Sequence, residues 1–172
     1  MPQLDLAKAR VLVVGAKGSA GSMLRMVLTA TGITRIVFVD EPHRALDLLC
    51  TDPFEAVLIE GDTLLGAEPF AFAARRNAML LNPMIPIFAV FGGPRRRDVE
   101  MARDQGITDV ICRPISPKTV ADKLKAALAT PRPFIAAPEF FGPDRRAKER
   151  PWRGEDRRVL TPKKTRVSFD LN

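Results

Sequence analysis

Short apolar runs alternate with longer amphipathic segments along the first 130 residues of the chain. The run Val-Leu-Val-Val within residues 10–14 is followed by Gly15 and contains no polar position. Such a run predicts a strand that is buried on both faces of a parallel sheet. Four later apolar runs predict the other strands, at 35–39, 56–59, 85–90 and 109–112.

The segments between these runs carry apolar residues at helical spacing and predict helices at about 20–31, at 42–50, within 67–80, at 95–105 and at 117–129. We expect Ser19 to cap the first helix and Gly32 to end it. Strands and helices that alternate with short connections favour an α/β fold, a doubly wound parallel sheet with helices on both faces. Its ligand site is expected beyond the carboxyl ends of the strands.

The composition changes after Thr130, where prolines become frequent and are expected to break regular structure. Residues 131–172 hold 11 Lys+Arg and 6 Asp+Glu, whereas residues 1–130 hold 16 and 14. We therefore predict one domain at 1–130 and a basic, largely irregular tail at 131–172. The alternation of polar and apolar residues allows one short strand within the tail, at 165–171.

Length and composition limit the class of protein. The 172 residues, 46% of them hydrophobic and 6% aromatic, suit one soluble α/β domain. No apolar run reaches the roughly 18 residues of a membrane helix, and a cytoplasmic location is expected. Cys50 and Cys112 lack metal-ligand neighbours, so we predict buried free thiols and no metal site.

The stretch from Gly106 to Ser116 combines a helix stop, a short buried strand and the pair Arg113-Pro114. With the order of the predicted elements, it resembles the last strand of a bacterial response-regulator receiver (CheY-like) domain. The resemblance covers about residues 8–130 and implies a flavodoxin-like sheet of five strands in the order 2-1-3-4-5. It also implies a role in two-component or phosphorelay signal transduction.

Receiver domains place two Mg²⁺-binding acidic residues after the first strand, a phospho-accepting Asp after the third, a Thr or Ser after the fourth and a Lys before Pro after the fifth. The resemblance puts Gly15 and Ala16 at the acidic pair, Glu60 at the acceptor, Phe91 at the hydroxyl position and Arg113 at the Lys position. Two residues without side-chain oxygens cannot replace the ligands that Mg²⁺ requires. The sequence thus predicts a degenerate phosphoacceptor site.

We therefore expect a pseudo-receiver that is not phosphorylated, is not an enzyme, needs no cofactor and acts through protein–protein interaction. An ion pair between Glu60 and Arg113 would hold the strand ends in one state. The alternative is an unusual but working response regulator, modified at Glu60 or at Asp62, which stands two positions later.

Arginines and one tryptophan are the candidate partner-binding residues, because guanidinium groups bind carboxylates or phosphates and tryptophan anchors interfaces. They are Arg95, Arg96, Arg97, Arg145, Arg146, Trp152, Arg157 and Arg158. The resemblance implies a histidine kinase or another response regulator as partner, or a homodimer through the helix at 95–105, the last strand and the last helix. Acidic residues interspersed in the tail disfavour nucleic acid.

A second family pattern overlaps the first strand. Gly15, Gly18 and Gly21 open the first helix with the spacing of a dinucleotide-binding turn, and Asp40 ends the second strand, where relatives of short-chain dehydrogenases read a ribose. A small NAD(P)-binding protein is therefore a further alternative. The chain contains no Tyr, which excludes the usual proton donor of that family.

Overall fold

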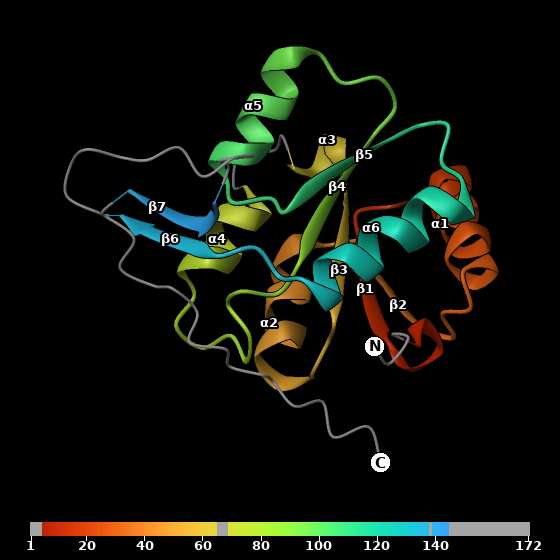
Figure 1. The fold of residues 1–172 in the computed structure, drawn as a ribbon, viewed down its shortest axis with the longest axis horizontal. Helices are drawn as coiled ribbons and strands as arrows, with labels where there is room; N and C mark the ends of the chain where they lie inside the picture. The colour runs from red at the N-terminus through yellow and green to blue at the C-terminus, as the bar shows by residue number, and fades with distance from the viewer. Residues whose placement is uncertain (1–4, 65–68, 138, 145–172) are drawn as a thin grey trace.

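The computed structural model describes residues 5–64, 69–137 and 139–144 (Figure 1). Five parallel strands form one sheet in the order β2-β1-β3-β4-β5, which confirms the predicted fold class and strand order. They are β1 (Arg10–Val14), β2 (Arg35–Val39), β3 (Ala56–Glu60), β4 (Ile87–Phe91) and β5 (Asp109–Cys112).

Helices cover both faces of this sheet (Figure 1). One face packs on α2 (Pro42–Thr51), α4 (Phe70–Arg76) and α5 (Arg96–Asp104). The other packs on α1 (Gly18–Ala30) and α6 (Pro117–Ala129). Two single turns complete the domain, η1 (Leu6–Lys8) before β1 and α3 (Gly61–Leu64) directly after β3.

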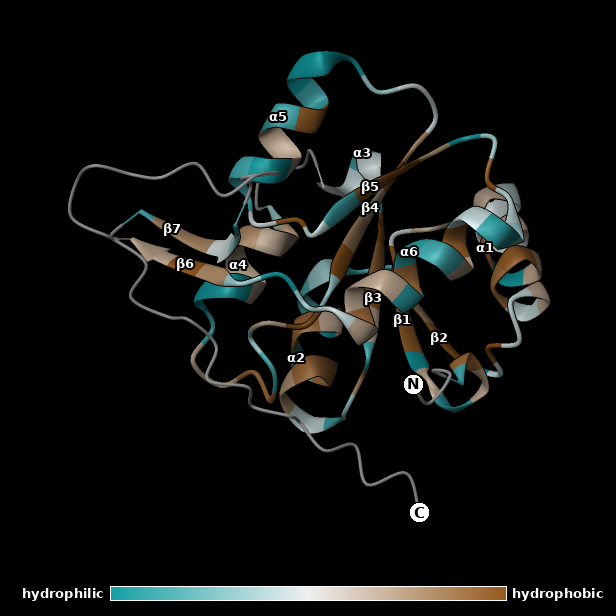
Figure 2. Ribbon diagram, viewed as in Figure 1, coloured by the Kyte–Doolittle hydropathy of each residue, from teal (hydrophilic) through white to brown (hydrophobic). Residues whose placement is uncertain are grey.

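The central strands form the hydrophobic core. Every residue of β4 is buried, and in β3 only the last residue is partly exposed (Figure 2). Each fully buried Val, Leu or Ile contributes about 1.5–3 kcal/mol relative to an exposed one. This burial explains why the apolar runs located the strands correctly, and it restricts polar chemistry to the strand ends.

The start of the first helix differs from the prediction. Lys17 is the N-cap residue, without a side-chain cap hydrogen bond, and α1 begins at Gly18, so Ser19 is not its cap. At the other end the prediction is confirmed, because Gly32 follows the C-cap with a φ of 92°, a conformation that glycine adopts without strain.

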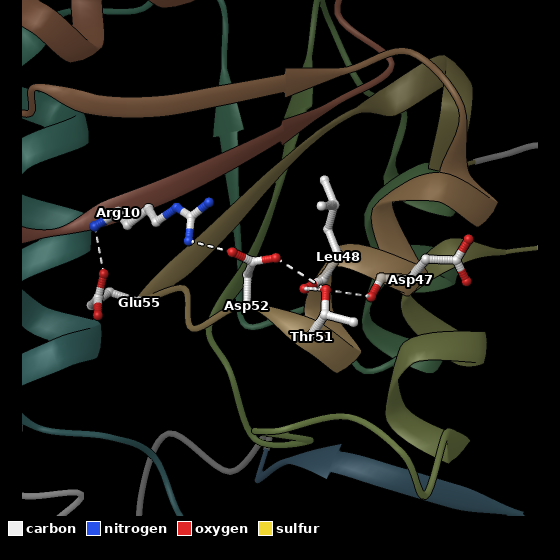
Figure 3. A network of polar contacts seen from close by, with 6 residues as sticks. All are labelled: Arg10, Asp47, Leu48, Thr51, Asp52 and Glu55. Atoms are coloured by element: carbon white, nitrogen blue, oxygen red, sulfur yellow. Dashed lines mark hydrogen bonds and ion pairs between the residues drawn. The ribbon is translucent and has the colours of Figure 1, made fainter.

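A polar network closes the amino-terminal edge of the sheet (Figure 3). Arg10 of β1 donates a hydrogen bond of 2.9 Å from its guanidinium to Asp52, and its backbone N–H donates to the carboxylate of Glu55. Thr51 donates to the other Asp52 oxygen at 3.0 Å. The hydrogen bonds from Arg10 and Thr51 lower the pKa of Asp52. These contacts tie the end of α2 to β1 and to the start of β3.

The structure of residues 134–143 differs from the expected irregular segment. Strands β6 (Phe134–Ala137) and β7 (Phe140–Pro143) form an antiparallel hairpin, and β7 contacts α4 (Figure 1). The prolines do not prevent it, since a two-stranded hairpin leaves each strand one edge without ladder bonds, where a missing N–H is tolerated. The strand allowed at 165–171 lies outside the described residues.

The cysteines also differ from expectation. Both are free, as predicted, but Cys112 is exposed and Cys50 only half-buried. Cys112 ends β5, which is an edge strand and has a sheet neighbour on one side alone. Within the described residues, no helix has the length and apolar character needed to cross a membrane.

Arg75 of α4 is buried beneath the hairpin, with 4% of its surface exposed. It donates hydrogen bonds to the backbone oxygens of Gly106, Pro83 and Ile85 at 2.7–3.0 Å. Its guanidinium also lies 5.1 Å from the ring centre of Phe134 in β6. Burial lowers the pKa of Arg75 to about 9, so the group is still charged at neutral pH. One side chain therefore joins α4, the loop before β4, the turn before β5 and the hairpin.

We expect Arg75→Met to reduce the free energy of unfolding by about 3 kcal/mol, because three carbonyl oxygens lose their donor and two of these hydrogen bonds are buried. Arg76→Met removes an exposed guanidinium from the same helix and is the control, with an expected loss below about 1 kcal/mol. Urea unfolding measures both. Equal losses for the two variants would contradict the role assigned to Arg75.

Candidate functional site at the carboxyl end of the sheet

The carboxyl ends of the strands bring most of the predicted site residues to one edge. Glu60 ends β3, Phe91 ends β4, Arg113 follows β5 and Gly15 follows β1. The register places Glu60 beside Val90 and Phe91 beside Cys112, so these ends are level across the sheet.

Glu60 and Arg113 form a bidentate ion pair. The two guanidinium nitrogens of Arg113 donate to the two carboxylate oxygens of Glu60, each at 2.7 Å. The exposed side-chain fractions are 12% for Glu60 and 22% for Arg113, so water screens the pair only in part. The hydrogen bonds from Arg113 to Glu60 raise the pKa of Arg113, and the charge of Asp62 adds to this effect.

The backbone holds Arg113 in place for this contact. Its N–H donates to the carbonyl oxygen of Phe91 at 2.8 Å, which extends the β4–β5 ladder by one bond. The peptide bond from Arg113 to Pro114 is cis. Because β4 lies between β3 and β5, the ion pair spans the end of the middle strand.

Phe91 fills the position where receiver domains carry a hydroxyl. Its side chain is 6% exposed and lies against Gly61, the first residue of α3. A Cβ atom at position 61 would overlap the Phe91 ring. The Phe91 ring can therefore lie within the strand-end region only because residue 61 is a glycine.

Thr63 of α3 occupies the space beside Gly15. Gly15 has a φ of 75°, and a Cβ atom there would overlap the Thr63 hydroxyl and its Cβ. The first position of the receiver acidic pair is therefore closed by a neighbouring side chain as well as by the lack of a carboxylate. Thr63 was not predicted from the sequence, because a contact from the turn after β3 to the end of β1 has no local signature.

The residues present do not fit a Mg²⁺ ion. Ala16 is buried and offers no side-chain oxygen, and the Glu60 carboxylate is already engaged by Arg113. Asp62, in the turn after β3, is exposed, and the other carboxylate at this edge, Asp40, follows the edge strand β2. Within the described chain, no group of three His, Cys, Asp or Glu residues could hold a metal.

The glycines of the dinucleotide pattern have different surroundings. A Cβ at Gly21 would lie 2.6 Å from the carbonyl oxygen of Ala16, so this glycine lets α1 approach the preceding turn. Gly18 faces open space. Internal packing thus accounts for Gly15 and Gly21 without a ligand.

Arg95, Arg96 and Arg97 lie at the start of α5 and are exposed. Arg96 pairs with Glu100 at 2.7 Å and Arg97 with Asp98 at 3.6 Å. The other predicted partner-binding residues lie outside the described residues; they are Arg145, Arg146, Trp152, Arg157 and Arg158.

Comparison with known proteins gives similarity in structure only. No protein-family model and no curated protein matches the sequence. The receiver domain of a sensor histidine kinase from Pseudomonas aeruginosa superposes with a TM-score of 0.60 at 17% identity, over 71% of this chain and 98% of that domain.

Two further solved structures agree. A chemotaxis response regulator of Vibrio cholerae gives a TM-score of 0.58 at 19% identity, over 70% of this chain and 98% of its own. A response regulator from Desulfuromonas acetoxidans gives 0.60 at 16% identity, over 70% and 97%. The chain therefore has the fold of response-regulator receiver domains, as the resemblance predicted.

Proposed function

We propose that this protein is a signalling module of the two-component or phosphorelay type whose receiver domain is not phosphorylated and which acts by binding other proteins. The observation that carries the proposal is the bidentate Glu60–Arg113 pair. It occupies both oxygens of the carboxylate that stands at the acceptor position.

Phosphoryl transfer to a carboxylate needs a free nucleophilic oxygen, a metal ion that neutralises the phosphoryl oxygens, and donors that hold the product. In this chain Glu60 accepts two hydrogen bonds from Arg113, Phe91 offers no donor, and Thr63 fills the space beside Gly15. The Pseudomonas neighbour, by contrast, was solved with a magnesium ion coordinated in its active-site cleft. Each of these differences from the receiver pattern favours a protein-binding role over phosphoryl transfer.

The same reasoning supports a partner-binding role for exposed cations. Arg95–Arg97 oppose the dipole at the start of α5, a placement that helix stability does not favour. We include them, with the arginines and Trp152 of the tail, in the surface that meets a histidine kinase, another response regulator or a second copy through α5, β5 and α6. The chain is then a binding module and not an enzyme.

Addition of Mg²⁺ with beryllofluoride, a phosphoryl mimic, is expected to leave the amide NMR signals of Gly61, Phe91 and Gly92 unchanged, because the mimic needs the metal and the free acceptor oxygen. The full-length protein is used, and a phosphorylatable receiver domain is the positive control. Shifts that cluster at these three residues would overturn the proposal.

Glu60→Asp is expected not to take up radiolabel from acetyl phosphate, since the shorter carboxylate still has no metal beside it. Adding Gly15→Asp and Ala16→Asp is expected to be insufficient as long as Thr63 fills the space next to position 15. Labelled protein from the single variant would show that the departures at Gly15 and Ala16 do not prevent the reaction.

Gly15→Ala and Gly18→Ala separate backbone strain from overlap, because both glycines have a positive φ and only Gly15 has Thr63 beside it. We expect Gly15→Ala to cost about 2 kcal/mol more than Gly18→Ala in urea unfolding. Thr63→Ala in the Gly15→Ala background removes the overlapping hydroxyl and should recover part of that difference. Equal costs for the two single variants would show that Thr63 does not close the site.

A further inference from the structure

A groove of about 780 Å³ lies between α1 and the end of β2, and its lining shares only Ala16 with the strand-end site. Figure 1 shows α1 at the right-hand margin of the molecule, beyond β2 and α6. Strand β2 is an edge of the sheet, so its outer side carries no further strand. The groove is therefore formed by one helix and one sheet edge.

One stripe of α1 lines this groove, and its members recur at intervals of three and four residues. They are Ser22, Arg25, Met26, Thr29 and Ala30. The buried residues of α1 are Gly21, Leu24, Val27 and Leu28, and of these only Gly21 also lines the groove. The small members of the stripe permit another helix to approach closely, as in helix packing with ridges in grooves. Met26 is 67% exposed and gives this stripe one apolar side chain that is open to a partner.

Three charged residues line the groove, Lys17, Arg25 and Asp40. Among the described residues, Lys17, Arg25 and Asp40 form no salt bridge, and Arg25 instead stacks on the ring of Phe38 at 4.2 Å. Two cations against one carboxylate make the groove net positive. A ligand that pairs with these groups must be mainly acidic.

Net charge also distinguishes between the molecules that could bind in the groove. A second copy carries a formal net charge of +7, and residues 131–172 of the chain itself are basic, so both would be repelled from a positive groove. A partner of opposite charge is attracted to it.

We propose that the groove between α1 and β2 is a docking site for an acidic amphipathic helix of a partner protein. An apolar side chain of that helix packs on Met26 beside the stacked Arg25 and Phe38, and its carboxylates pair with Arg25 and Lys17. This is helix-in-groove recognition, with anchors at helical spacing on both partners. The inference rests on the proposed function in one respect, that the chain works by binding protein; it does not involve the Glu60–Arg113 pair.

The test uses the full-length chain and a synthetic amphipathic helical peptide of about 16 residues with a leucine stripe and glutamates on both flanks. A peptide with lysine in place of each glutamate is the matched probe. We expect the acidic peptide to shift amide NMR signals of residues 17–30 and 38–40, and the lysine peptide to leave them unchanged at about 1 mM.

Arg25→Glu is expected to weaken the affinity for the acidic peptide at least about tenfold in fluorescence anisotropy, and Met26→Ser to weaken it as well. Arg76→Glu, which reverses an exposed cation on α4, is the control and should leave it unchanged. Thermal unfolding verifies that each variant is folded.

Any of four results would overturn the inference: no shift at about 1 mM, shifts that lie on α5, equal binding by Arg25→Glu, or dimers seated on α1 without peptide. A negative result with the peptide does not change the result expected with Mg²⁺ and beryllofluoride. The docking proposal and the proposed function can therefore fail independently.

Discussion

The arrangement at the functional edge of this domain depends on the contact between the carboxylate of Glu60 and the guanidinium of Arg113. The two residues belong to the ends of β3 and β5, which are not neighbours, and the contact crosses the end of β4. It can form because the parallel register brings the ends of β3, β4 and β5 level. At the end of β4, the Phe91 ring packs against Gly61. A side chain larger than glycine at 61 would displace the ring.

The energetics of such a pair favour specificity over stability. Removing two charges from water costs about as much as their attraction returns, so a partly buried ion pair adds little net free energy. Loss of one partner is costly, however, since it leaves the other charge poorly solvated. The pair therefore penalises every arrangement in which Glu60 and Arg113 are apart. A phosphorylation switch needs two states of similar free energy. The Glu60–Arg113 contact raises the free energy of any second state in which the two residues are apart.

The strand order was implied by the resemblance to receiver domains. The sequence itself predicted the strands and the Glu60–Arg113 contact, because buried strands are uniform apolar runs and the ends of parallel strands meet at one edge of the sheet. It did not predict what depends on contacts between distant segments. Thr63 beside Gly15 and Phe91 over Gly61 are packing relations between turns, and neither residue type indicates them. The exposure of Cys112 follows from its place at the end of an edge strand, whereas its apolar neighbours in sequence suggested burial.

The hairpin β6–β7 was missed for a related reason, and Arg75 explains how it belongs to the fold. Proline-rich sequence reads as irregular when taken alone, yet this segment packs on α4, where the guanidinium of Arg75 lies beneath Phe134. A buried cation stays charged only where acceptors replace the water that it has lost, and three backbone carbonyl oxygens do so for Arg75. The hairpin covers the side chain, and Arg75 supplies donors that the turn at Gly106 and the loop before β4 would otherwise lack. The segment after α6 is thus part of what stabilises the strand ends, because the same turn at Gly106 leads into β5 and on to Arg113.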